Sequence, residues 1–342
     1  RKNMFKLVDM ETGVKTTFVD SRNNYTLENQ NNQTGEFELD LNNSNNNLYL
    51  ENILAGYINL KKQIKRISVQ AGIRAENTSV HASNKELGFE LTRNYLKWFP
   101  TVTVDYNRSD KHSFNFSVTR RIDRPNYKDL NPYKSYQDAY TSSLGNSDLL
   151  PQTALNFNAS HTYKHKFTNS VSVKYFTNLI MNYELQNDST RETIMTVKNI
   201  TGTIYIYNAF VQQKITPWWN GRLSGHAYLA KFVGTVNNAP IDRWVNSYFV
   251  NINNDFTLKN DFKLSIAAFY AGPNAFGIQY FKSKWGLNLE LKRTFLNNKL
   301  TVSLAAMDIF YKDIFAYGSK FQTQDILFTI KNDSQRLQIS AS

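Results

Sequence analysis

The sequence contains no cysteine, and its 342 residues include no run of about 18 consecutive apolar residues. The first absence excludes disulfide-stabilised scaffolds and thiolate metal sites. The second excludes a membrane protein built from transmembrane helices. The sequence does not exclude a membrane β-barrel, because each strand of such a barrel presents an apolar side chain to lipid only at every second residue.

Catalytic signatures are also missing. The sequence has no nucleophile elbow, no phosphate-binding Walker loop and no His-Glu-x-x-His pair. The five histidines are scattered, and His161 and His165 would share a face only in a helix, whereas they lie in an expected strand. We therefore expect neither an enzyme nor a bound metal or cofactor.

Aromatic residues are abundant, at 14% of the chain, and the formal net charge is +12. Tyr and Phe supply most of the aromatics, and both favour strands and membrane interfaces. The positive charge fits a nucleic-acid surface, a basic interior for anionic solutes, or contact with phosphorylated lipid headgroups. The basic residues are spread along the chain and form no motif that recognises nucleic acid. We therefore expect no nucleic-acid partner.

Two-residue alternation is the main structural signal, and residues 111–152 show it best. Phe114, Phe116 and Val118 fall on one face of a strand, and small polar residues fall on the other. A long polar excursion follows, and a second alternating strand begins near Ala154. This strand, loop and strand form the repeating unit of an antiparallel barrel.

The rest of the chain repeats this unit, with short turns alternating with longer connections. Short turns are expected at 108–111, 164–169, 216–220, 259–261, 295–298 and 332–335. Longer connections are expected at 78–95, 187–202, 234–242, 272–282 and 317–323. The strands between them reach about 10–17 residues, longer than the usual mode of about 5–6. In outer-membrane barrels short turns face the periplasm and long loops face outside.

The sequence therefore predicts an all-β fold, a transmembrane antiparallel β-barrel with roughly 14–16 strands in this chain. Residues 1–47 are expected to be an irregular Asn-rich segment with one or two early strands, and residues 48–342 to form the barrel strands and loops. A soluble sandwich needs turn signals every 8–12 residues, whereas hairpins here recur about every 35–58. Four tryptophans lie at strand ends, as in an interface belt: Trp98, Trp218, Trp219 and Trp244.

The run from Arg120 to Tyr133, followed by Gly145-Asn146-Ser147 and Pro151, resembles the C-terminal barrel of TonB-dependent outer-membrane receptors. It is most similar to the outer-membrane β-barrel family abundant in Bacteroidota, over roughly residues 48–342. The motif residues with an expected structural role are Arg124, Pro125, Leu130, Pro132, Gly145 and Pro151. The family usually has proline where this chain has Ser147, which changes the stiffness of the loop.

The resemblance implies a plugged barrel of about 22 strands in the bacterial outer membrane. It implies import of a scarce nutrient: a chelated metal, a glycan, a peptide or a cofactor such as a cobalamin. The implied partners are outer-membrane lipid including lipopolysaccharide, the TonB system acting through a plug that is not in this chain, and a surface lipoprotein or other envelope subunits. Neither end of the sequence has the features of a natural terminus, so we expect a piece of a longer protein.

The two-residue alternation of the strand at 113–119, continued past its end, predicts which way the following charged side chains point. We call this alternation the strand parity. Arg121 and Asp123 continue the polar face and are expected to point inward at the outer rim, whereas Arg120 and Arg124 are expected to point outward toward lipid phosphate. Either an ion-paired corner that fixes the long loop or a ligand contact explains this cluster. The candidate ligand-binding residues are Arg121, Asp123, Asn131, Tyr133, Tyr136, Tyr140 and Asn146.

Two other functions stay open at this point. One is a structural or assembly barrel that has kept the fold without transport, as a subunit of an envelope complex. The other is a passive porin. A plug with a TonB-contacting segment in the full-length protein would favour import over both.

Overall fold

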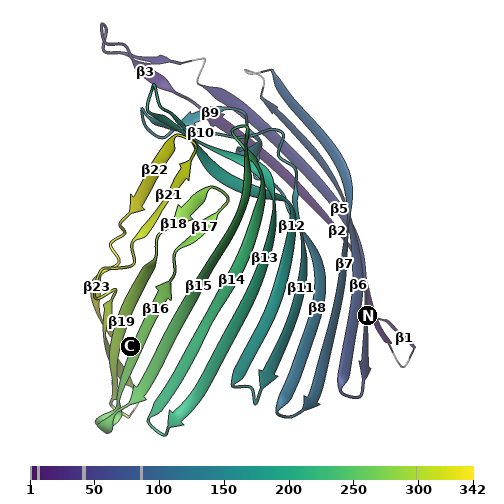
Figure 1. The fold of residues 1–342 in the computed structure, drawn as a ribbon, viewed down its shortest axis with the longest axis vertical. Coiled ribbons are helices and arrows are strands. Elements are labelled where there is room, and N and C mark those ends of the chain that lie inside the picture. Colours follow the sequence, from purple (N-terminus) through teal and green to yellow (C-terminus); the bar gives the residue numbers. More distant parts are fainter. Residues whose placement is uncertain (1, 6–7, 41–43, 85–87, 298) are drawn as a thin grey trace.

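The computed structural model describes residues 2–5, 8–40, 44–84, 88–297 and 299–342. Most of them lie in antiparallel strands of one large curved sheet (Figure 1). The expected all-β barrel architecture is confirmed. Among the described residues, no helix is both long and apolar enough to span a membrane.

The wall consists of strands that each pair with the next one along the sheet. After the short β1 (Lys2–Phe5), the described wall strands are fourteen: β2 (Val8–Tyr25), β5 (Asn45–Ile64), β6 (Ile67–Asn84), β7 (Phe89–Ser109), β8 (His112–Asp123), β11 (Gln152–Tyr163), β12 (Phe167–Asn187), β13 (Glu192–Thr216), β14 (Trp219–Val236), β15 (Ala239–Thr257), β16 (Phe262–Ala271), β19 (Lys284–Phe295), β20 (Leu300–Met307) and β23 (Arg336–Ala341). β2 lies in segment 1–47, where one or two early strands were expected.

The two faces of the wall differ in chemistry, as the alternation predicts. Val102 of β7 lies opposite Val118 of β8, and both are exposed. On the other face Asn115 of β8 donates a hydrogen bond to Asp105 of β7. A sheet with an exposed apolar face and a polar inner face is suited to lipid outside and water or a plug inside.

Tight turns close one end of the wall at the expected places between β7 and β8, β11 and β12, β13 and β14, and β15 and β16. The turn between β11 and β12 uses Lys164 and His165, whose φ angles are 50° and 54°. The turn after β15 contains the short 3-10 helix η1 (Lys259–Asp261), with Asn260 at φ 58°. These left-handed residues reverse the chain within a few positions.

Three of the expected long connections are instead strands. β6 and β7 extend across most of 78–95, of which 85–87 lie outside the described residues, and only four residues separate β12 from β13. β14 and β15 are joined by Asn237 and Asn238 alone. The prediction was wrong because above the lipid zone neither face needs to be apolar, so alternation fades while backbone pairing continues.

Two further expected loops, 272–282 and 317–323, contribute to a second, four-stranded sheet, which we call the inner sheet. It consists of β17 (Asn274–Phe276), β18 (Gln279–Phe281), β21 (Phe315–Phe321) and β22 (Gln324–Ile330). β18 pairs with β21 and so joins the hairpins β17–β18 and β21–β22, which the wall strands β19 and β20 separate in the sequence. Residues 332–335, expected to form a wall turn, instead connect the inner sheet to β23.

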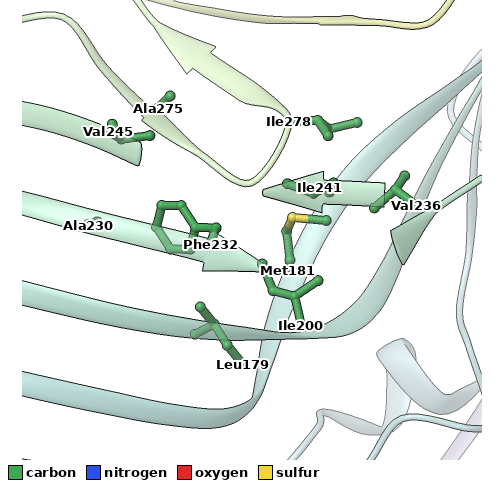
Figure 2. Packing of buried hydrophobic residues seen from close by; sticks show 10 residues of the cluster. All are labelled: Leu179, Met181, Ile200, Ala230, Phe232, Val236, Ile241, Val245, Ala275 and Ile278. Carbon is green, nitrogen blue, oxygen red and sulfur yellow. The ribbon is translucent and has the colours of Figure 1, made fainter. Parts of the chain in front are cut away.

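The inner sheet rests on the wall through a hydrophobic cluster. Ala275 and Ile278 of the hairpin β17–β18 pack with Met181, Ile241 and Phe232 of the wall (Figure 2). Phe232 faces away from lipid, because its neighbour Val233 is exposed on the other face. Each fully buried side chain of this size contributes about 1.5–3 kcal/mol.

The segment 124–151, which we call the mouth loop, is folded onto the upper end of the wall. It contains α1 (Tyr127–Leu130), β9 (Lys134–Tyr136) and β10 (Thr141–Leu144), and β10 pairs in parallel with the start of β13. Its Leu130 and Leu149 are buried against Tyr49, Val80 and Ala82 of β5 and β6. A separate hairpin of β3 (Glu28–Gln30) and β4 (Phe37–Leu39) projects beyond the wall (Figure 1).

Candidate functional site

A cavity of about 930 Å³ lies at the end of the wall that carries the mouth loop. The mouth loop, the upper ends of β2, β12 and β13, and the inner sheet line it. We call it the mouth cavity. Six tyrosines are among its lining residues: Tyr25, Tyr127, Tyr133, Tyr136, Tyr183 and Tyr317.

Three of the candidate ligand-binding residues line the mouth cavity, namely Asn131, Tyr133 and Tyr136. Tyr140 is among the residues that lie outside this lining, and the residue is 62% exposed. Asn146 also lies outside the lining and donates from Nδ2 to the carbonyl oxygen of Val197, at 3.1 Å. Its contact therefore holds the mouth loop on β13.

Arg121 and Asp123 do not line the mouth cavity. By register they lie opposite Ala154 and Gln152 of β11, on the face away from lipid, and the Gln152 amide donates to Asp123 at 3.0 Å. Ligand contact by any of the candidate residues stays a prediction.

The outward orientation expected for Arg124 was wrong. Its Nη2 donates to Glu76 Oε2 at 2.7 Å and to Thr78 Oγ1 at 2.8 Å, and its Nε lies 3.4 Å from Glu51 Oε1. Both carboxylates are buried. Parity failed because β8 ends at Asp123 and the chain turns at Pro125, which releases Arg124 from the alternation of the strand.

We call the contacts of Arg124 with Glu51, Glu76 and Thr78 the Arg124 corner. It is ion-paired, which is one of the two arrangements that the sequence allowed. It joins the start of the mouth loop to β5 and β6. Arg120 lies by register on the outer face, where its guanidinium contacts the Trp98 carbonyl oxygen at 3.5 Å. Outward placement holds for Arg120 but not for Arg124.

The other motif residues shape the mouth loop. A side chain at Gly145 would place its Cβ 2.3 Å from the Asn131 carbonyl oxygen and 2.6 Å from that of Lys128. Only glycine allows this close approach. Leu130 and Pro125 are buried, whereas Pro132 and Pro151 are half-buried. Gly145 also lines the mouth cavity.

Arg93 of β7 is a contact that sequence reasoning missed. Its guanidinium donates to the carbonyl oxygens of Ser147 and Leu149 and so clamps the end of the mouth loop. No motif in the sequence indicates this role, because the partners are main-chain atoms more than 50 residues away.

Glu184 is the second residue that the sequence did not indicate. It lies near the upper end of β12, its side chain lines the mouth cavity, and only 3% of the residue is exposed. Gln279 of the inner sheet donates to Glu184 Oε1 at 2.6 Å, while Oε2 is buried without a hydrogen-bond partner among the described residues. Burial raises the pKa of this carboxyl above its ordinary value, and the hydrogen bond from Gln279 opposes that shift.

Charged groups are few around the mouth cavity despite the high net charge. Its charged lining residues are Lys128, Asp129 and Glu184. Asp129 is already engaged, because its Oδ2 accepts hydrogen bonds from the backbone and side chain of Asn126, each at 3.2 Å. Within the described part of the chain, no group of three or more His, Asp or Glu side chains is placed to hold a metal ion.

Three solved structures share this fold over nearly the whole chain. The copper transporter OprC is 11% identical, with a TM-score of 0.72, 98% of this chain covered and 54% of its own. The ferric yersiniabactin uptake receptor FyuA from Yersinia pestis is 13% identical, with a TM-score of 0.64 and coverage of 98% and 51%. The ferric citrate transporter FecA is 11% identical, with a TM-score of 0.66 and coverage of 99% and 52%.

The chain thus spans about half the length of these neighbours. Their likeness to this chain confirms the fold that the sequence resemblance to TonB-dependent receptors implied. No curated protein sequence matches the chain. A model of the outer membrane protein beta-barrel family matches residues 1–342.

Proposed function

We propose that this chain, which belongs to the outer membrane protein beta-barrel family, forms part of the wall of a receptor for TonB-dependent uptake of a scarce nutrient. The protein is an outer-membrane protein of bacteria. The observation that carries the proposal is the mouth cavity, which lies at the end of the wall that carries the mouth loop and is lined by the mouth loop, wall strands and the inner sheet. A binding site at the mouth is what a receptor needs before its cargo enters the lumen.

Two features support a receptor over an open pore. The inner sheet is packed on the lumen face of the wall, so it occupies space that a wide passive channel would leave to water. The mouth loop is fixed by the Arg124 corner, by Arg93 and by buried leucines, which gives the cavity a preformed shape. Preformed sites bind ligands with a smaller entropic cost than sites that must order on binding.

The cargo is a chelated metal, a glycan, a peptide or a cofactor under this proposal. The names of the neighbouring structures refer to copper, ferric yersiniabactin and ferric citrate. Each of these names describes the cargo of the neighbour that carries it, not the cargo of this chain. The proposed partners are outer-membrane lipid including lipopolysaccharide, which the outward Arg120 would meet, and the TonB system acting through a plug. A surface lipoprotein or another envelope subunit would sit over the mouth.

The test compares bacteria that lack the full-length protein, bacteria that lack TonB, and the parent. Each strain is grown on limiting ferric citrate, oligosaccharides, peptides or cobalamin as the sole source of iron, carbon, nitrogen or cofactor. We expect one shared growth defect in both mutants, corrected in the first by the intact gene. A defect in the first mutant that is absent without TonB would indicate a passive porin. Intact growth on every source, together with a leaky envelope, would indicate a structural barrel.

A further inference from the structure

Uncharged polar side chains and aromatic rings make up most of the lining of the mouth cavity. Beside the six tyrosines, the lining includes uncharged amide and hydroxyl groups: Asn23, Asn131, Ser135, Gln137, Ser143, Asn182, Thr196 and Gln279. These groups both donate and accept hydrogen bonds. A ligand that satisfies them must also do both, and a hydroxyl group does so at a single oxygen atom.

Glu184 adds a buried hydrogen-bond acceptor to this site. Gln279 is held to Oε1, so Oε2 is the buried acceptor that no described group satisfies. An unpaired buried acceptor is costly unless a donor reaches it. The donor required next to Oε2 would come from the ligand.

We propose, building on the receptor function above, that the mouth cavity binds an uncharged, hydroxyl-rich ligand of the short-oligosaccharide class. In this arrangement Glu184 accepts a hydrogen bond from a ligand hydroxyl. The tyrosine rings, among them Tyr136 and Tyr317, pack against the apolar faces of the sugar rings. Aromatic rings give large contact area with little loss of conformational entropy, and their hydroxyls add hydrogen bonds at the rim.

An anionic metal chelate fits this lining poorly. It would meet the Glu184 carboxylate, and the cavity offers a single cation, Lys128, and no arginine among its described lining residues. Arginine clusters are the usual means of holding carboxylate or phosphate groups. A like charge placed against a desolvated carboxylate works against binding.

A strongly cationic ligand also fits poorly. It would pair with Glu184, but ammonium and guanidinium groups only donate hydrogen bonds, so they would offer no acceptor to the amide N–H groups of Asn131 and Asn182. Lys128 would repel it as well. The volume, about 930 Å³, is at the upper end of the usual range for small-ligand sites and admits a chain of several sugar rings.

The test uses the purified full-length protein in detergent on an array of neutral oligosaccharides, with ferric citrate and trilysine as competitors. Three variants are compared with the parent: Glu184→Gln, which keeps the size of the side chain, Tyr136→Ala at the exposed rim, and Glu290→Gln as the matched control. Glu290 pairs with Lys292 on the wall, away from the cavity. Folding of each variant is checked by the heat-shifted band on unboiled gels.

We expect binding to at least one neutral oligosaccharide, weakened tenfold or more by Glu184→Gln and by Tyr136→Ala and unchanged by Glu290→Gln. Neither ferric citrate nor trilysine should compete. If Glu184→Gln fails to fold, Tyr136→Ala decides alone, since Tyr136 is 38% exposed and lies outside the buried clusters. Absence of array binding, full binding by the folded variants, or competition by either charged probe would overturn the proposal.

The two proposals fail separately. Binding of ferric citrate together with a growth defect shared by the TonB mutant would overturn the oligosaccharide and leave the receptor intact. Oligosaccharide binding with growth that does not depend on TonB would overturn energised uptake and leave the binding site in place.

Discussion

Replacing Arg124 by methionine removes a cation from a buried position while keeping much of the side-chain volume. The Arg124 side chain is 18% exposed, and the side chains of Glu51 and Glu76 that it pairs with are 11% and 10% exposed. Methionine leaves two buried carboxylates without their shared partner, and Thr78 loses a hydrogen-bond donor. Breaking a buried ion pair from one side costs about 3–5 kcal/mol, so the free energy of unfolding should fall by that amount.

A combined variant separates the charge from the loss of packing. Adding Glu51→Gln and Glu76→Gln to Arg124→Met removes both carboxylates that Arg124 pairs with, while Arg74, which also pairs with Glu76, is 47% exposed and keeps its contact with water. We expect this variant to recover to within about 1–2 kcal/mol of the parent, because neutral groups of similar volume replace the ion pairs. Arg120→Met is the matched control. Its guanidinium makes one long contact on the outer face, so its change should stay within about 0.5 kcal/mol.

The assay is urea unfolding of the full-length protein in lipid vesicles, with limited proteolysis of the mouth loop as a second readout. The midpoint should shift without a change in slope if stability alone is altered. Cleavage within 124–151 should accelerate for Arg124→Met and not for Arg120→Met. A loss below about 1 kcal/mol for Arg124→Met, or a combined variant no better than the single one, would refute the ion-paired corner.

Three further predictions follow from the packing. Gly145→Ala should displace the mouth loop and speed its proteolysis, because the added Cβ would lie 2.3 Å from a carbonyl oxygen; an unchanged cleavage rate would contradict this. Phe232→Ala should lower the free energy of unfolding in urea by about 3–5 kcal/mol and loosen the inner sheet, because Phe232 packs between this sheet and the wall. A loss under about 1 kcal/mol would show that the contact is dispensable. Val102→Arg on the lipid face should cost about 2–4 kcal/mol, whereas Thr103→Arg on the inner face should cost much less, and equal losses would overturn the assignment of the faces.

Alternation along the chain was sufficient to predict the wall, because lipid on one side and a polar interior on the other impose a two-residue period. It failed where that constraint ends. Residues such as Thr78 and Asn84 continue a strand above the lipid zone, yet their polarity resembles that of a loop. The inner sheet was missed for the same reason, since its short hairpins are defined by packing on Phe232 and Met181 rather than by a periodic pattern.

The candidate site was only partly predictable. The mouth loop stood out through its motif, and Asn131, Tyr133 and Tyr136 do line the cavity. Glu184 did not stand out, because its partner Gln279 is 95 residues away and comes from a segment expected to be a loop. Arg124 was assigned to the wrong side because parity holds only inside a strand. Contacts between distant segments leave no local signal.

The parallel pairing of β10 with β13 sets an order of events during folding. The strands β11 and β12 lie between them in the sequence and pair as local hairpins with their neighbours, so the wall can close there without the mouth loop. Pairing of Thr141 with Thr193 needs that stretch of wall first. Such long-range contacts form late, because the intervening chain must already be ordered. We therefore expect the part of the mouth cavity formed by β10 and β13 to close after the wall strands β11 and β12 have paired.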